Sequence, residues 1–538
     1  MRGLGVLVVG CLIFLYSIPA IAQDTTGRMM VRTSDADAAP LPGVTVTIAS
    51  PSLIGGARTG VTDERGEALF LTLGPGSYEV SAALRGFATQ ERTEVRVRLG
   101  SLTALNLAMP EATFAGEIEV FAETPVIDPQ QIGIEQVFDA DYIEKTAIGT
   151  WQRFATSPGE QSPGAVDQQF FGSIDSENAW FLDGIEVTQP SWGGLTNGAA
   201  NFGIDAYDEI EVKTGGYEAE YGRALGGVTS IVMKSGGNEF SGSLDVRYQP
   251  DAFQESGVHF DPDLQESMNL AIEATLGGPI IRDRLWFFLS YYYGESESTP
   301  EGAPTTRRGK VKAPKAKLTW QISEAWRGVA TYFGSEFSYE NFLSSRSIMP
   351  EATPYMRREP DHLALETTGM LSDKAMWTIR GGLDRQPFDT GPMRGELEPI
   401  AHLNFATGVL SNNFFYQGWN DIDRVQAATD LTWFLSGERT THELKAGLAV
   451  TDTGATMATC STGTPGGVRC SADVGGLVFY DFQIAENDIP YQMIEEFTAG
   501  PVDLSSTLWS GFVQDAWRPT ADLTVKAGLR YDTVRYDI

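Results

Sequence analysis

The chain has few basic residues, little cysteine or histidine, and no long apolar run after its first twenty-odd residues. Because no later stretch reaches eighteen consecutive apolar residues, no transmembrane helix is expected there. Lysine and arginine total 39 against 71 aspartate and glutamate, a net charge of −32. Nucleic acid is therefore not an expected partner, since phosphate contacts need an excess of cations. The four histidines form no metal-ligand or nucleophile-partner pattern, so no catalytic residue, metal site or cofactor is expected.

The first residues have the composition of an export signal. Arg2 precedes an almost unbroken apolar segment at 4–18, and Ala20-Ile21-Ala22 has the small-x-small pattern of a cleavage site. We therefore predict a signal peptide over residues 1–22. Two alternatives remain open: an uncleaved anchor helix, and lipidation at Cys11, where the apolar segment continues past the residue that would be modified.

Two cysteines follow this segment, Cys460 and Cys470. They flank a Gly-, Thr- and Pro-rich stretch that is expected to be a loop. In an exported protein such a pair favours a disulfide over a metal site, and no histidine lies nearby to complete a zinc set. Two free thiols are the alternative.

Residues 26–109 have the pattern of a β-sandwich. Short alternating segments, such as 44–48, 78–82 and 95–99, are separated by turns rich in glycine and proline. Four motifs resemble the carboxypeptidase regulatory-like domain: LPGVTV at 41–46, TDERG at 62–66, LGPGSY at 73–78 and LRGF at 84–87. The resemblance implies a domain without catalytic activity.

Residues 130–236 are rich in glycine and short strands, as suits a small α+β insert that lies inside a crowded lumen. The motif WFLDGI at 180–185 predicts a strand that runs into a turn. Three further motifs follow: YDEIEVKTGGY at 207–217, EYGRALGGV at 220–228 and IVMKSG at 231–236. A phosphate loop is not predicted, because no Lys-Ser/Thr pair follows a Gly-x4-Gly spacing.

These motifs closely resemble the plug of TonB-dependent receptors, most of all the Oar-like branch that also carries a regulatory-like domain. The resemblance implies an outer-membrane transporter whose plug is moved with energy from the TonB complex. It assigns plug folding and docking to eight residues: Asp183, Gly184, Glu209, Tyr221, Gly222, Arg223, Gly226 and Gly227. It also makes residues 110–129 a linker that holds a candidate TonB box, Glu117, Ile118, Glu119 and Val120. A plain linker or a first plug strand is the alternative.

Residues 237–538 are predicted to form long amphipathic strands. At 425–435, 444–450 and 523–531, apolar side chains alternate with polar ones over about ten residues, as in transmembrane β-barrels. Strands of soluble sandwiches are usually shorter. Tight turns are predicted at 281–283, 323–325, 372–374 and 518–521, and long exterior loops at 294–314, 338–360, 386–423 and 451–506. The aromatic runs at 286–288 and 291–293 are expected in interfacial girdles.

The strand count predicts an incomplete barrel. Roughly eleven strands fit between 239 and 538, whereas a closed single-chain bacterial barrel has an even number. Plugged transporters of this kind use about 22. The predicted fold is therefore mainly β: an N-terminal sandwich, a small α+β plug, and about half of an antiparallel barrel at 237–538 that contacts outer-membrane lipid.

The predicted function is that of a TonB-dependent outer-membrane receptor, which binds an unknown extracellular ligand and imports it past the plug. An adhesion, matrix or glycan-binding protein of the same architecture, without transport, is the alternative hypothesis. An enzyme is not predicted. His259, Asp261 and Asp263 could hold a cation, but a solvated acidic loop explains them better.

Overall fold

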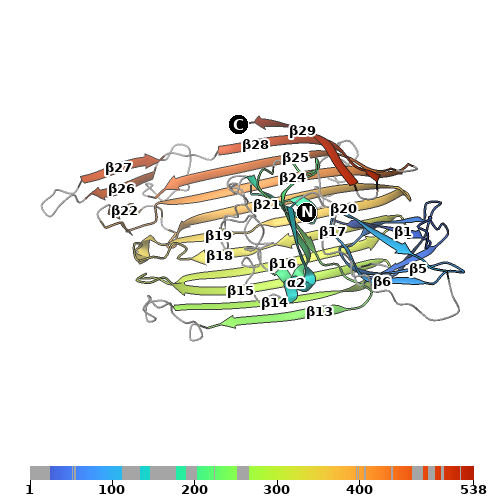
Figure 1. Ribbon diagram of the computed structural model, residues 1–538. Helices are drawn as coiled ribbons and strands as arrows, with labels where there is room; N and C mark the ends of the chain where they lie inside the picture. The colour runs from blue at the N-terminus through green and yellow to red at the C-terminus, as the bar shows by residue number, and fades with distance from the viewer. Residues whose placement is uncertain are drawn as a thin grey trace.

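The structure, a computed structural model, consists mostly of β-strands (Figure 1). It describes residues 25–537 except 51–52, 54–55, 112–133, 146–176, 190–202, 223, 251–265, 396, 398, 405–406, 438–439, 463–475, 483–490, 498–501 and 521–522. Among these described residues, no helix combines the length and the apolar character needed to cross a membrane. The predicted mainly β fold class is confirmed.

The N-terminal part is a sandwich of two sheets, with strand orders β4-β1-β7 and β3-β2-β5-β6. Its strands are β1 (Gly27–Ser34), β2 (Thr45–Ala49), β3 (Arg58–Val61), β4 (Glu67–Leu73), β5 (Gly76–Ala83), β6 (Gln90–Val97) and β7 (Leu102–Ala108). Alternate side chains point between the sheets, so Met29, Ile48 and Tyr78 are buried in one shared apolar core.

The plug is a small mixed sheet with the order β10-β9-β12-β11-β8. Its elements are β8 (Ile134–Asp139), α2 (Ala140–Lys145), β9 (Ala179–Leu182), β10 (Ile185–Glu186), the 3-10 helix η2 (Ile204–Ala206), β11 (Tyr207–Gly215) and β12 (Val228–Met233). The plug core includes Trp180 and Ile210, and it continues into Phe288 and Phe333 of the large sheet. The plug is therefore seated directly against that sheet (Figure 1).

The large sheet is antiparallel and follows the path β13-β14-β15-β16-β17-β20-β21-β24-β25-β28-β29. The strands on this path are β13 (Ser241–Gln249), β14 (Glu266–Ile281), β15 (Leu285–Thr299), β16 (Arg307–Gln321), β17 (Trp326–Gly334), β20 (Asp361–Ser372), β21 (Ala375–Pro392), β24 (Tyr416–Ser436), β25 (Thr441–Ser461), β28 (Val502–Thr520) and β29 (Leu523–Asp537). In the described part of the chain, β13 and β29 are the two ends of an open sheet. The predicted incomplete antiparallel barrel is confirmed.

The two faces of this sheet differ in polarity as predicted. On β24, Val425, Leu431 and Trp433 are exposed on the outer face. Arg424 and Asp430, which have the opposite parity, are buried on the inner face. This period-2 alternation puts apolar side chains toward lipid and charged ones toward the lumen.

The segments 294–314, 386–423 and 451–506, predicted as long exterior loops, consist mostly of strand among their described residues, so that prediction is wrong for them; in 338–360, strands cover only 338–340 and 354–358. β24 and β25 are 21 residues long each, because their polar outer halves still pair through backbone hydrogen bonds. The ends of β15 and β16 occupy most of 294–314. Small strands occupy parts of the other three segments: β18 (Glu336–Glu340), β19 (Pro354–Arg358), β22 (Ala401–Asn404), β23 (Val409–Ser411), β26 (Gly476–Phe482) and β27 (Tyr491–Phe497).

The aromatic runs at 286–288 and 291–293 only partly face the outside, where the predicted girdles would lie. Trp286 and Phe288 are buried on the lumen side, whereas Tyr291 is exposed on the outer face. Successive side chains of a strand point to opposite faces, so consecutive aromatic residues cannot all lie in one interfacial girdle.

Candidate functional site: the contact between plug and barrel wall

The first contact holds the turn between β9 and β10. Asp183 (φ 42°) and Gly184 (φ 79°) both adopt the left-handed conformation that a tight turn needs. The Asp183 carboxylate accepts a bond from the Met233 backbone N–H (3.1 Å) and pairs with Lys317 Nζ of β16 at 3.3 Å. Lys317 Nζ also donates to the Met233 carbonyl (2.7 Å). One wall lysine therefore ties the turn to the end of β12 in a buried site.

The second contact captures the backbone that follows this turn. Arg424 of β24 donates to the carbonyls of Glu186 (3.0 Å) and Thr188 (2.6 Å). Gln426 donates to the same Glu186 carbonyl at 2.7 Å and accepts from the Glu186 N–H at 3.3 Å. Two side chains of the wall thus bind backbone N–H and C=O groups of the plug that would otherwise need a neighbouring strand.

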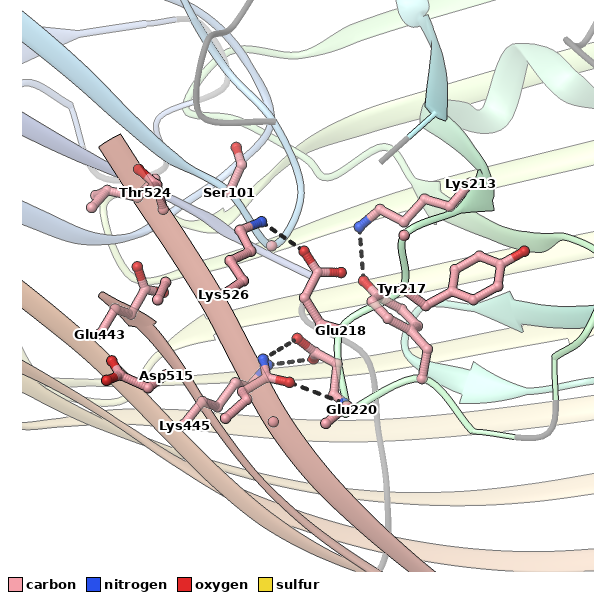
Figure 2. Close-up of a pocket in the computed structure, with 18 of the residues that line it drawn as sticks. Ser101, Lys213, Tyr217, Glu218, Glu220, Glu443, Lys445, Asp515, Thr524 and Lys526 are labelled. Carbon is pink, nitrogen blue, oxygen red and sulfur yellow. Dashed lines mark hydrogen bonds and ion pairs between the residues drawn. The ribbon is translucent and has the colours of Figure 1, made fainter. Parts of the chain in front are cut away.

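The third contact is a loop at 217–221 that lies against β25, β28 and β29 (Figure 2). Glu218 pairs with Lys526 at 2.8 Å, and Glu220 pairs with Lys445 at 2.5 Å. Gln514 donates to the Glu220 carboxylate (2.9 Å) and accepts from its backbone N–H (3.0 Å). Each acidic side chain of the loop therefore meets a cation of the wall.

This loop borders a cavity of about 540 Å³ between the sandwich, the plug and the wall. Cations and anions both line it: Arg28, Arg98, Lys213, Lys445, Lys526 and Arg530, with Glu135, Glu218, Glu220, Glu443 and Asp515. Several of these charges are already paired across the cavity (Figure 2). The cavity is thus lined by polar side chains from all three parts, and among the described residues no group of side chains could hold a metal ion.

The glycines of the predicted plug motif lie where other atoms come close. A Cβ at Gly222 would overlap the guanidinium of Arg530, which also donates to the Glu220 carbonyl at 2.9 Å. The Gly226 carbonyl accepts a bond from the Tyr217 hydroxyl, and the Gly227 N–H donates to Asn178 at 2.7 Å. Tyr221 accepts a bond from Lys213 Nζ at 2.9 Å.

Glu209 of β11 lies apart from these three contacts, on the side of the plug that faces the sandwich. Its carboxylate accepts a bond from the Leu99 N–H at 3.2 Å. Burial raises the pKa of Glu209 to about 8, although the Leu99 bond acts in the opposite direction. The structure therefore separates Glu209 from Asp183, Tyr221 and the glycine motif.

Several predicted site residues lie outside the described part of the chain. They are Arg223, the TonB box candidates Glu117, Ile118, Glu119 and Val120, and Cys470; Cys460 lies in β25, and nothing is described of its side chain. The acidic segment with His259, Asp261 and Asp263 also falls outside. These predictions stay predictions.

The wall partners of the plug were missed as site residues. They are Lys317, Arg424, Gln426, Lys445, Gln514, Lys526 and Arg530. A signal was present, since alternation puts Lys445, Lys526 and Arg530 on the water-facing side of their strands. A charged residue at a lumen position of a barrel strand is a candidate partner for an insert in that lumen.

Two family models match the chain. Residues 30–110 match the carboxypeptidase regulatory-like domain, and residues 303–536 match an outer membrane beta barrel domain. The TonB-dependent transporter Oar of Myxococcus xanthus is 30% identical to this chain over 309 residues, a match that covers 54% of this chain and 28% of Oar.

Solved structures of similar fold include outer-membrane transporters and receptors. The outer membrane transporter YddB from Escherichia coli is 14% identical with a TM-score of 0.58, and the siderophore receptor PirA from Acinetobacter baumannii is 19% identical with a TM-score of 0.53. Each match covers 75% of this chain and 57% of the other. This chain thus spans less than two thirds of the relatives that it matches. The chain therefore contains a carboxypeptidase regulatory-like domain and an outer membrane beta barrel domain, and in sequence and fold it is similar to TonB-dependent outer-membrane transporters and receptors.

Proposed function

We propose that this chain is part of a receptor that binds an extracellular ligand and imports it by moving the plug with TonB-delivered energy. The observation that carries the proposal is the set of polar contacts that join the plug to the wall beside the apolar contact at Phe288 and Phe333. Lys317, Arg424 and Lys445 each bind the plug through hydrogen bonds or ion pairs. Such bonds can be exchanged for bonds to water when the plug shifts, whereas a wholly apolar interface would resist hydration.

The experiment uses the intact protein in its own outer membrane. Replacing Gly226 and Gly227 by valine should abolish uptake. Both residues directly precede β12, and their backbone N–H groups donate to the Glu177 carbonyl and to the Asn178 side chain. Gly215→Ala is the matched control, since a Cβ there meets no atom within 4 Å. Uptake that survives the double valine change would contradict the role of the plug.

Deleting TonB separates transport from the alternative, an adhesion, matrix or glycan-binding protein of the same architecture. Loss of ligand accumulation without TonB, with surface binding retained, supports transport. Activity that is independent of TonB supports the alternative.

The ligand class is the next question. PirA is a siderophore receptor, and another similar structure is the ferric citrate transporter FecA, at 12% identity and a TM-score of 0.51. Identities this low speak for the fold alone. Expression of the intact locus under iron starvation, compared with growth on glycans, would assign the ligand class: induction by iron starvation favours a ferric chelate, and induction by glycans favours a carbohydrate.

We further propose the unobserved features predicted from the sequence: cleavage after residue 22, domain boundaries at 26–109, 130–236 and 237–538, a TonB box at 117–120, and a Cys460–Cys470 disulfide. The mass of the mature protein before and after reduction and alkylation tests the cleavage and the disulfide. Pro replacement of Ile118 or Val120 tests the box, because proline removes the N–H that strand addition needs.

A further inference from the structure

The N-terminal sandwich lies across one end of the large sheet, at the side of the tight turns (Figure 1). In the β4-β1-β7 sheet, one face packs on the sandwich core and the other faces the barrel wall. On that face Met30, Leu71 and Leu102 are buried against Met376 of β21 and Phe434 of β24. This apolar contact joins the sandwich to the rim of the barrel wall.

Polar contacts extend the same interface around the rim. Arg28 pairs with Glu443 of β25 at 3.0 Å, and the hydroxyl of Thr25 donates to Glu366 of β20 at 2.7 Å. At the outer margin, Asp63 pairs with Lys374 at 3.7 Å, in the turn between β20 and β21. Four strands of the wall, β20, β21, β24 and β25, and one turn therefore contact the sandwich.

The sandwich also binds the plug. The Leu99 N–H donates to Glu209 of β11, and Arg96 pairs with Asp139 at the end of β8. β8 and β11 are neighbouring strands of the plug sheet. A single domain thus touches the plug and the wall at once, so the plug cannot move toward this end of the sheet while the sandwich stays in place.

We propose that the sandwich is a removable stopper, which holds the plug in the resting receptor and must undock before the plug moves. The role of the stopper rests on the proposed transport function, whereas the docking of the sandwich rests only on the contacts described above. Undocking leaves the sandwich folded, because its own core lies between its two sheets. It exposes the β4-β1-β7 face, Glu209 and the rim.

Zero-length carbodiimide coupling in intact outer membranes tests the docked state. The 3.7 Å separation of Lys374 Nζ from the Asp63 carboxylate predicts an amide crosslink, detected by peptide mass spectrometry. Lys374→Arg should abolish this crosslink, since guanidinium does not couple. Absence of the crosslink in the unaltered protein would overturn the proposal.

Met30→Lys tests the release of the stopper. The side chain faces the rim rather than the sandwich core, so the variant should fold but dock poorly. We expect the crosslink to fall about tenfold and the Leu99 amide to exchange about tenfold faster. Val61→Lys is the matched control, because Val61 is exposed on β3 of the opposite sheet, and it should leave both readouts unchanged.

The outcomes separate the two proposals. If Met30→Lys leaves the crosslink and the exchange unchanged, the stopper is wrong, whatever the uptake assay shows. If the crosslink behaves as expected but ligand accumulation does not depend on TonB, the docking stands and the transport function fails. If both hold, Met30→Lys should raise the initial uptake rate, because one contact fewer restrains the plug.

Discussion

Two ion pairs between plug and wall have the same chemistry but different surroundings. Asp183–Lys317 and Glu218–Lys526 each join a plug carboxylate to a wall lysine, at 3.3 and 2.8 Å. The side chains of the first pair are 3% and 4% exposed, and those of the second are 22% and 32% exposed. Loss of the lysine should cost more stability in the Asp183–Lys317 pair, although this pair is the longer one. The carboxylate that remains there is buried and poorly solvated.

The difference divides the plug into a dry edge and a hydrated edge. At Asp183 the turn, the end of β12 and Lys317 form one unit whose charged side chains are almost inaccessible to solvent, beside a smaller cavity of about 210 Å³. At Glu218 the cavity already admits solvent, and water can replace the lysine. We expect the 217–221 loop to detach from the wall before the Asp183 turn does.

The largest expected effect comes from breaking the dry edge. Lys317→Met leaves the Asp183 carboxylate buried without its cation, which should destabilise the seated plug by about 3–5 kcal/mol. The double variant Asp183→Asn with Lys317→Met should recover much of the loss, because no lone charge remains. Protease protection of the plug in isolated outer membranes, measured against urea, checks this.

Lys310→Met is the matched control for that experiment. Lys310 is an exposed lysine of the same strand, paired with Glu295 on the outer face. Its replacement should leave plug protection unchanged. Equal effects of Lys310→Met and Lys317→Met would show that burial does not distinguish the two sites.

The second effect concerns pH at the junction between plug and sandwich. Burial raises the pKa of Glu209 to about 8 from its ordinary 4.5, with Asp208 and Glu135 raising it further and Arg98 lowering it. Since the docked state holds the proton more tightly, docking is strongest below about pH 4.5 and weakens as pH rises toward 8, by at most about tenfold in the docking equilibrium per pH unit.

Glu209→Gln should remove this pH dependence while it keeps an oxygen acceptor for Leu99. The measurement is the distance between spin labels on the sandwich and on the barrel rim, followed from about pH 4 to about pH 9, a range that brackets the window between 4.5 and 8. An unaltered pH profile in Glu209→Gln would assign the effect to another group.

A smaller effect is expected from steric pressure at the hydrated edge. Gly222→Ala would push the Arg530 guanidinium away from the loop carbonyls of Ala219 and Glu220. We expect about 1–3 kcal/mol of plug destabilisation, typical of overpacking. Gly215→Ala, in open space on β11, should change little, and the comparison is made by the same protease assay.

The sequence predicts the local features of this site better than its pairings. The turn at Asp183 and Gly184 is predictable because few residues tolerate positive φ, and alternation alone puts Lys526 on the lumen side of its strand. The partner of Asp183, however, lies 134 residues away along the chain. Which wall residue meets which plug residue depends on strand register and sheet curvature, and these emerge only when the whole sheet forms.

The predicted exterior loops failed for a related physical reason. Polar segments such as 386–392 and 451–461 lack an apolar face, which is the usual sign of a strand. Each nevertheless extends a hairpin already fixed by its membrane half, so the added residues gain backbone hydrogen bonds in a register that is already set. Hydrophobic periodicity reports the lipid-facing part of a barrel strand, not its full length.

The smallest effect should come from the exposed pair itself. Lys526→Gln removes the cation facing Glu218 but leaves Glu218 in contact with solvent, so we expect less than about 1 kcal/mol of plug destabilisation. The unaltered protein should lose the same amount when salt is raised to about 1 M, because the Debye length falls to about 3 Å. The Lys317 contact should be nearly insensitive to salt, since its side chains are shielded from it. If added salt weakened the Lys317 contact as much as the Lys526 contact, the distinction between a dry and a hydrated edge would fail.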